Sequence, residues 1–192
     1  MTKLKVGIVV GSNRRESINR KLAQALSQLG ANAFEAKLIQ IDDLPMYNQD
    51  HEQPVPAPVA RFKAEVEASD ALLFVTPEHS RSIPAVLKNA IDWGGRPYGT
   101  TVWPGKPAAV IGASPGAIST AIAQSHLRTV LGSFSAMHVL GGEAYIQFKP
   151  ELVDAQGEVA DESVRAFLKD FIDRFAGFAG KFAPQRAAAA AA

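Results

Sequence analysis

Short apolar runs alternate with amphipathic segments along the chain. Five runs are rich in valine, isoleucine, leucine and alanine, a composition typical of strands that are covered on both faces of a sheet. They are bounded by glycine, proline and polar residues, which end strands. The predicted strands are residues 5–10, 34–41, 71–76, 108–111 and 136–140.

The segments between these strands predict helices. After the first run, apolar residues recur at close to helical spacing from Ile18 to Leu29, and Gly30 is a typical helix end. The last segment carries an apolar stripe that favours packing against the sheet. The proline-rich segment 44–58 predicts irregular structure, and the segment 143–160 is expected to be irregular with a turn at 155–157. Further helices are predicted at 59–68, from the N-cap Ser82 to 94, from 117 to about 131, and at 161–182.

Strand and helix alternate throughout, which predicts a parallel sheet with helices on both faces. No repeat or second domain is visible, so we expect one domain over residues 1–182 and a tail at 183–192. In such sheets ligands bind beyond the carboxyl ends of the strands, where the strand order reverses. The loops 11–19, 77–82 and 112–116 leave these ends and are expected to meet at one rim.

The composition of the chain excludes several classes of function and partner. The net charge of the 192 residues is +1, which gives no reason to expect nucleic acid or an anionic membrane as a partner. The chain has no cysteine, which excludes disulfides, iron–sulfur clusters and thiol catalysis and fits a cytoplasmic location. No apolar stretch is long enough to span a membrane. The four histidines lack metal-ligand spacing, so no metal is expected.

The first loop has the composition of an anion site. It joins a buried strand to the N-terminus of a helix, where free backbone N–H groups and the helix dipole favour negative charge. Ser12, Ser17 and Asn19 add hydrogen-bond donors, and Arg14 or Arg15 adds positive charge. We therefore expect these residues to hold a phosphate.

Two other interpretations of this loop stay open on these residues. The chain lacks G-x-x-x-x-G-K-[ST] and G-x-G-x-x-G, which speaks against a triphosphate or a dinucleotide. Asp42 and Asp43 nevertheless follow the second strand, where a dinucleotide site holds a ribose. The plainer alternative is a solvated turn capped by Ser17.

The segment 112–116 matches the serine hydrolase pattern G-x-S-x-G. In that pattern the residue after the serine donates its backbone N–H to the oxyanion, and Pro115 has none. No acidic residue lies between Ser114 and His138, and no histidine follows His138. A hydrolase is therefore not expected. A phospho-acceptor domain is not expected either, because the first strand ends in Ser-Asn-Arg-Arg rather than in carboxylates.

Four motifs together resemble the NAD(P)H-dependent FMN reductases, in particular their quinone and chromate reductase branch. The motifs are GSNRRESIN at 11–19, TPEHSRSIP at 76–84, LKNAIDW at 87–93 and GASPG at 112–116. The resemblance extends from the first strand to the last helix. It implies a flavodoxin-like three-layer α/β sandwich with a five-stranded parallel sheet in the order 2-1-3-4-5.

The resemblance also implies a site. The first loop would bind the phosphate of non-covalent FMN, the segment 77–80 would run beside the isoalloxazine ring, and 114–116 would lie near it. The implied cofactor-binding residues are Ser12, Arg14, Ser17, Ile18, Asn19, Pro77, Glu78, His79, Ser80, Ser114, Pro115 and Gly116.

The expected function is that of an FMN-dependent oxidoreductase without catalytic side chains. NADPH or NADH would deliver a hydride to FMN, and a small-molecule electron acceptor such as a quinone would replace it in a ping-pong reaction. The family implies a homodimer or homotetramer. His79 and Ser80 stand where the family often has Tyr-Asn, a difference that bears on acceptor preference. The alternatives are a flavodoxin-type electron carrier, which the near-neutral charge disfavours, and a flavin-binding sensor.

Overall fold

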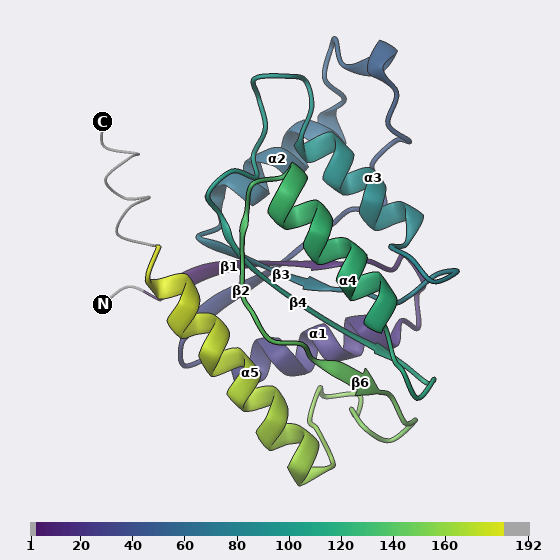
Figure 1. Cartoon of the computed structure of the whole chain (residues 1–192), viewed down its shortest axis with the longest axis vertical. Coiled ribbons are helices and arrows are strands. Elements are labelled where there is room, and N and C mark those ends of the chain that lie inside the picture. Colours follow the sequence, from purple (N-terminus) through teal and green to yellow (C-terminus); the bar gives the residue numbers. More distant parts are fainter. Residues whose placement is uncertain (1–2, 183–192) are drawn as a thin grey trace.

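A parallel sheet forms the middle layer of the computed structural model, which describes residues 3–182 (Figure 1). Its strands run in the order β2-β1-β3-β4-β5, and a further strand, β6, also pairs with β4. The predicted strand order is therefore confirmed. The strands are β1 (Leu4–Val10), β2 (Phe34–Ile39), β3 (Ala71–Val75), β4 (Pro107–Ser114), β5 (His138–Val139) and β6 (Tyr145–Gln147).

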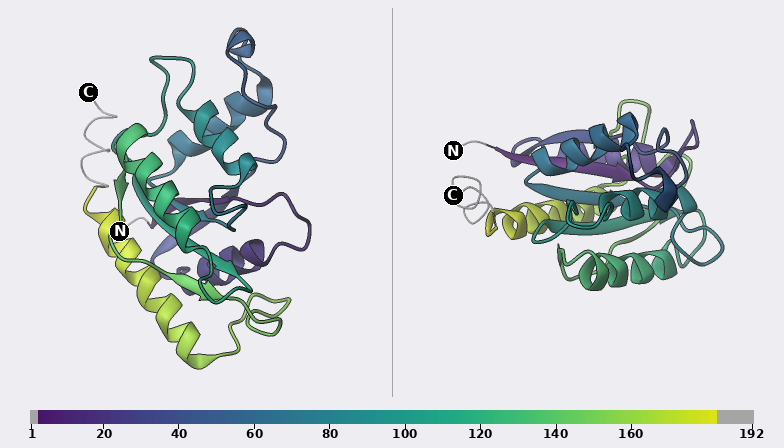
Figure 2. Two further views of the ribbon diagram at one scale, coloured as in Figure 1. Left: turned by 45° about the vertical axis from the view of Figure 1, so that its right-hand side comes forward. Right: turned by 90° about the horizontal axis from the view of Figure 1, so that it is seen from above.

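Helices cover both faces of this sheet (Figures 1 and 2). α1 and α5 pack on one face, and α2, α3 and α4 pack on the other. Because β3 is central and covered on both sides, all of its residues are buried. No helix in residues 3–182 has the length and apolar character needed to cross a membrane. The helices are α1 (Ile18–Leu29), α2 (Ala57–Ala68), α3 (Ala85–Gly94), α4 (Ala121–Thr129) and α5 (Glu162–Gly180).

The stripe predicted on the last helix packs against the sheet as expected. Leu168, Phe171, Ile172 and Phe175 are buried in the core beneath α5. The side chain of Asp161 caps this helix by accepting the backbone N–H groups of Ser163 and Val164 at 2.9 and 3.1 Å, which fixes the start of α5 one residue later than predicted.

The edge of the sheet beside β4 differs from the single fifth strand predicted at 136–140. β5 pairs only with the beginning of β4, whereas β6 pairs with its end, where Gly112 lies opposite Tyr145. Between β5 and β6 the chain passes through Gly142, whose φ of 92° is rarely adopted by residues with a side chain. The segment expected to be irregular thus contributes a strand, and β4 extends to Ser114.

Two further local predictions need correction. α3 begins at Ala85 with Pro84 at its N-cap position, not at Ser82. The hydroxyl of Ser82 instead lies 3.1 Å from Nδ1 of His126 on α4. The loop 44–58 contains one turn of 3₁₀ helix, Gln49–His51, capped by the side chain of Asn48. The predicted tail at 183–192 lies outside the described residues.

β3 and β4 lie so close together at Gly112 that no side chain fits. A Cβ atom added there would overlap with the carbonyl oxygen of Thr76 and the hydroxyl of Thr120. This close approach holds the loops that follow the two strands next to each other.

We expect Gly112→Ala to lower the free energy of unfolding by about 3 kcal/mol or more, because overpacking costs roughly 1–3 kcal/mol and a backbone carbonyl cannot rotate away. Gly177→Ala is the matched control, since an added Cβ on this exposed position of α5 meets no atom within 4 Å. It should raise stability by up to about 1 kcal/mol. Urea unfolding followed by circular dichroism measures both, and equal stabilities of the two variants would contradict the close approach.

Candidate functional site

The loops after β1, β3 and β4 leave the sheet at the same edge, on the right-hand side of Figure 1, and surround one cleft. Its volume is about 360 Å³. Ten of the twelve predicted site residues line it, while Ser80 and Gly116 do not, and Asn13 and Ala113 are additional. The lining residues are Ser12, Asn13, Arg14, Ser17, Ile18, Asn19, Pro77, Glu78, His79, Ala113, Ser114 and Pro115.

The first loop presents the N-terminal end of α1 to the cleft. Ser17 is the N-cap, and its Oγ accepts the backbone N–H of Arg20 at 3.3 Å. Ile18 and Asn19 form the first turn of α1, where backbone N–H groups have no carbonyl partner within the helix. With Arg14 lining the same cleft, these groups suit a phosphate.

In contrast to the sequence-based expectation, the side chain of Asn19 is not free to donate to a phosphate. It is buried and spans to the end of β4, where Nδ2 donates to the carbonyl oxygen of Ala113 and Oδ1 accepts its N–H, each at 2.9 Å. The amide therefore joins the first loop to the third. The backbone N–H of Asn19 stays at the helix terminus.

The second loop forms a tight turn. His79 and Ser82 exchange two backbone hydrogen bonds, at 3.1 and 2.9 Å, and Ser80 and Arg81 lie between them with left-handed φ values of 48° and 62°. This geometry places Ser80 at the tip, away from the cleft lining. Glu78 precedes the turn, and its carboxylate accepts hydrogen bonds from the first turn of α4.

The third loop is supported by β6. Ser119 donates its hydroxyl to the carbonyl oxygen of Ile146 at 2.8 Å, and Gln147 donates its side-chain amide to the carbonyl oxygen of Pro115 at 3.2 Å. Within the loop, the N–H of Gly116 donates to Oγ of Ser114 at 3.1 Å. The strand that sequence reasoning missed thus holds one wall of the cleft.

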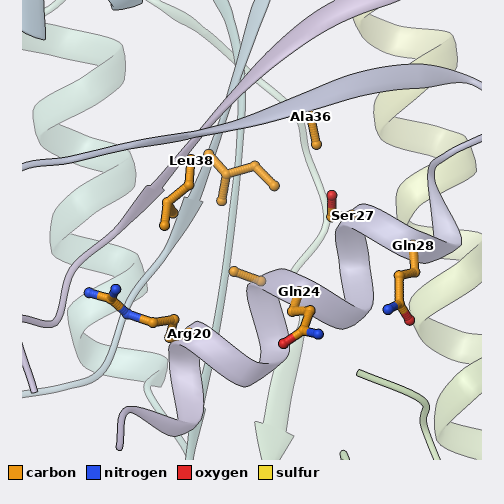
Figure 3. Close-up of a pocket in the computed structure, with 8 residues that line it drawn as sticks. Arg20, Gln24, Ser27, Gln28, Ala36 and Leu38 are labelled. Carbon is orange, nitrogen blue, oxygen red and sulfur yellow. The ribbon is translucent and has the colours of Figure 1, made fainter. Parts of the chain in front are cut away.

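A second hollow lies away from the three loops, between α1 and the edge strand β2 (Figure 3). Its volume is about 290 Å³, and Ile8, Ala36 and Leu38 contribute apolar surface to it. Arg20 and polar side chains of α1 also line it. None of the predicted site residues lines this hollow. A neighbouring hollow is lined by Ser12 and by Asp42, one of the two acidic residues considered for a dinucleotide ribose.

The three-loop cleft fits a flavin mononucleotide. Its volume lies in the range of about 300–1,000 Å³ that is usual for small-molecule sites. One end offers the terminus of α1 and Arg14 to a single phosphate, and Pro77, His79 and Pro115 line the remainder. Glu78 is the one acidic residue among the described lining residues, and its carboxylate is engaged with α4 rather than facing a bound anion.

Comparisons with known proteins agree with this geometry. The family model of NADPH-dependent FMN reductases matches residues 4–151. A 2-hydroxy-1,4-benzoquinone reductase from Burkholderia is 45% identical over 175 residues, which are 91% of this chain and 96% of that protein. A quinone reductase from Pseudomonas putida is 47% identical over 174 residues, 90% of this chain and 93% of that protein.

Solved structures extend the likeness to the whole fold. The flavoenzyme NAD(P)H:(acceptor) oxidoreductase FerB from Paracoccus denitrificans superposes with a TM-score of 0.90 at 44% identity, covering 93% of this chain and 98% of FerB. A WrbA-like flavodoxin from Agrobacterium tumefaciens shares the fold, with a TM-score of 0.64 at 15% identity, covering 94% of this chain and 99% of that one. The chain therefore belongs to the NADPH-dependent FMN reductase family, which confirms the resemblance carried by the four motifs.

Asn19→Ala should lower the free energy of unfolding by about 2–4 kcal/mol, because it leaves the buried N–H and carbonyl of Ala113 unpaired at roughly 1–3 kcal/mol each. Asn13→Ala changes an exposed residue of the same loop and should alter stability by less than about 0.5 kcal/mol. Urea unfolding of both proteins without added flavin measures the difference. An Asn19→Ala protein as stable as the Asn13→Ala protein would show that the bridge does not hold the loops.

Proposed function

We propose that this member of the NADPH-dependent FMN reductase family binds FMN non-covalently in the three-loop cleft and reduces small quinones with NAD(P)H. The observation that carries the proposal is the open N-terminus of α1, which meets two further loops at the carboxyl edge of a parallel sheet. The chain is an oxidoreductase, as its family is.

The chemistry belongs to the cofactor, and the protein supplies binding and orientation. When bound, FMN would supply the redox chemistry between NAD(P)H and the acceptor. The hydroxyls of Ser12 and Ser17, the guanidinium of Arg14 and the backbone N–H groups of Ile18 and Asn19 hold the phosphate. The loops that line the cleft would orient the ring for NAD(P)H and for the acceptor in turn.

The ring lies between the second and third loops in this proposal. Pro77, Glu78 and His79 border it on one side, and Ser114 and Pro115 border it on the other. Ser80 and Gly116 do not line the cleft, so they act by shaping the two loops. Residues 1–182 form the single FMN-binding domain.

Quinones are the proposed acceptors because the relatives from Burkholderia and Pseudomonas putida carry names of quinone reductases. We further propose a cytoplasmic homodimer or homotetramer. Apolar side chains on and beside α4 support an assembly, since Ile118, Ile122 and Phe134 are 53%, 39% and 65% exposed.

Adjacent arginines allow a matched test of the phosphate position, because Arg14 lines the cleft and Arg15 does not. Arg14→Ala should weaken FMN binding about tenfold or more, since a hydrogen bond to a charged group contributes roughly 1.5–3 kcal/mol. Riboflavin, which lacks the phosphate, should bind to the Arg14→Ala protein as tightly as to the wild type. Arg15→Ala should bind FMN within about twofold of the wild type.

Quenching of flavin fluorescence during titration gives all of these dissociation constants. Equal losses for FMN and riboflavin, or equal losses in the two arginine variants, would place the phosphate elsewhere.

The proposed role of the protein as a binding scaffold predicts that no side chain of the second loop is essential for reduction. In stopped-flow experiments NADPH should bleach the bound flavin at a rate in the ordinary enzyme range of about 1–1000 per second. His79→Ala should stay within about threefold of that rate, because hydride transfer depends on orientation rather than on a protein acid. His51→Ala, outside the cleft, is the control.

Bleaching far slower than this range in the wild type would favour an electron carrier. A collapse of the rate in His79→Ala, with FMN still bound, would make His79 a catalytic residue.

A further inference from the structure

A buried carboxylate connects the second loop of the cleft to the helix behind the third loop. Oε2 of Glu78 accepts the backbone N–H groups of Ile122 and Ala123, each at 3.0 Å. Oε1 lies 3.3 Å from Nη1 of Arg81, and the side chain of Glu78 is only 8% exposed. Ile122 lies 44 residues further along the chain, so this contact exists only in the folded protein.

The contact provides a hydrogen-bond acceptor for backbone N–H groups at the start of α4. The side chain of the N-cap residue Thr120 accepts no backbone N–H of the helix and bonds only to the side chain of Gln124, whereas α1 and α5 are capped by their own N-cap residues, Ser17 and Asp161. The first turn of a helix has backbone N–H groups without partners, and its positive dipole end favours a carboxylate. The beginning of α4, and with it the end of the third loop, therefore depends on Glu78.

The turn that follows Glu78 needs support from outside. Ser80 and Arg81 both adopt left-handed φ values, a strained conformation for residues with side chains that persists where the surroundings enforce it. α4 contacts the turn on both sides of this strained pair. Glu78 reaches its first turn, and the hydroxyl of Ser82 lies 3.1 Å from Nδ1 of His126 in its last turn.

We propose that Glu78 is a positioning residue whose carboxylate sets the separation of the two loops that flank the flavin ring. The inference rests on the proposed binding of FMN in this cleft. Pro77 and His79, the neighbours of Glu78, line one wall, and Ser114 and Pro115 line the other. Because the carboxylate reaches the helix behind the second wall, its loss lets the two walls move relative to each other.

This role predicts which part of the cofactor is affected. The walls joined by Glu78 border the ring, whereas the phosphate lies at the terminus of α1. Loss of the carboxylate should therefore weaken FMN and riboflavin by the same factor. A residue that contacts the phosphate would weaken FMN alone.

The test compares Glu78→Ala and Glu78→Gln with Asp161→Ala. Asp161 is a matched control, because its carboxylate also accepts two backbone N–H groups at a helix start but belongs to α5 and does not line the cleft. Dissociation constants for FMN and riboflavin are measured by fluorescence quenching, the absorption bands of the bound flavin are recorded, and thermal melts without flavin report the stability of each protein.

We expect Glu78→Ala to raise both dissociation constants roughly tenfold, in the lower range of couplings between sites. Its flavin absorption bands should shift relative to those of the wild type, because the walls around the ring have moved. Glu78→Gln keeps an acceptor oxygen without the charge and should lie between Glu78→Ala and the wild type. Asp161→Ala should melt at a lower temperature but bind both flavins within about twofold of the wild type.

The outcomes separate this inference from the proposed function. A wild-type protein that binds no FMN overturns both. A wild type that binds FMN, together with a Glu78→Ala protein that binds both flavins as tightly and only melts earlier, makes Glu78 a helix cap without a positioning role. A loss confined to FMN also overturns the inference. If Glu78→Ala does not fold, Glu78→Gln decides by the same criteria.

Discussion

The cleft depends on two buried polar side chains that join its three loops. The carboxamide of Asn19 pairs with both polar atoms of the Ala113 peptide group, and the carboxylate of Glu78 pairs with the first turn of α4. No residue of the cleft loops 11–17, 77–82 and 115–120 belongs to the buried apolar core. Directional hydrogen bonds are therefore what fixes these loops. The bonds between Asn19 and Ala113 are costly to break because buried partners would be left unpaired.

The split edge of the sheet belongs to the same arrangement. β6 pairs with the end of β4, and its Ile146 carbonyl accepts the hydroxyl of Ser119 from the third loop. On the other side of β4, Gly112 allows close contact with the backbone of Thr76 at the end of β3. β4 therefore has close contacts on both sides at the point where its loop begins. A single β5 at the predicted position would have left this end of β4 without a strand on the side away from β3.

The sequence predicts most of the strands and the three loops well, because buried strands and amphipathic helices leave periodic signals that depend on neighbouring residues only. The order of the strands is instead implied by the family resemblance of the four motifs. The three residues of β6 are too few for such a signal. Asn19 does leave one, since it shares the buried stripe of α1 with Leu22 and Ala23, three and four positions later, where a polar residue needs an internal partner. Glu78 leaves none, because its partners are backbone groups of a helix 44 residues away.

The N-termini of α1 and α4 at this rim differ in whether a negative charge already neutralises them. This difference bears on which ligand the cleft selects. The positive end of α4 is already met by Glu78, a carboxylate of the same chain. The positive end of α1 carries only the hydroxyl of Ser17 and opens into the cleft with Arg14 beside it. One anion position therefore stays open between these two helices, and the other is filled from within. A cleft built in this way matches a ligand with a single phosphate and an uncharged ring better than one with a pyrophosphate, in keeping with the missing G-x-G-x-x-G motif.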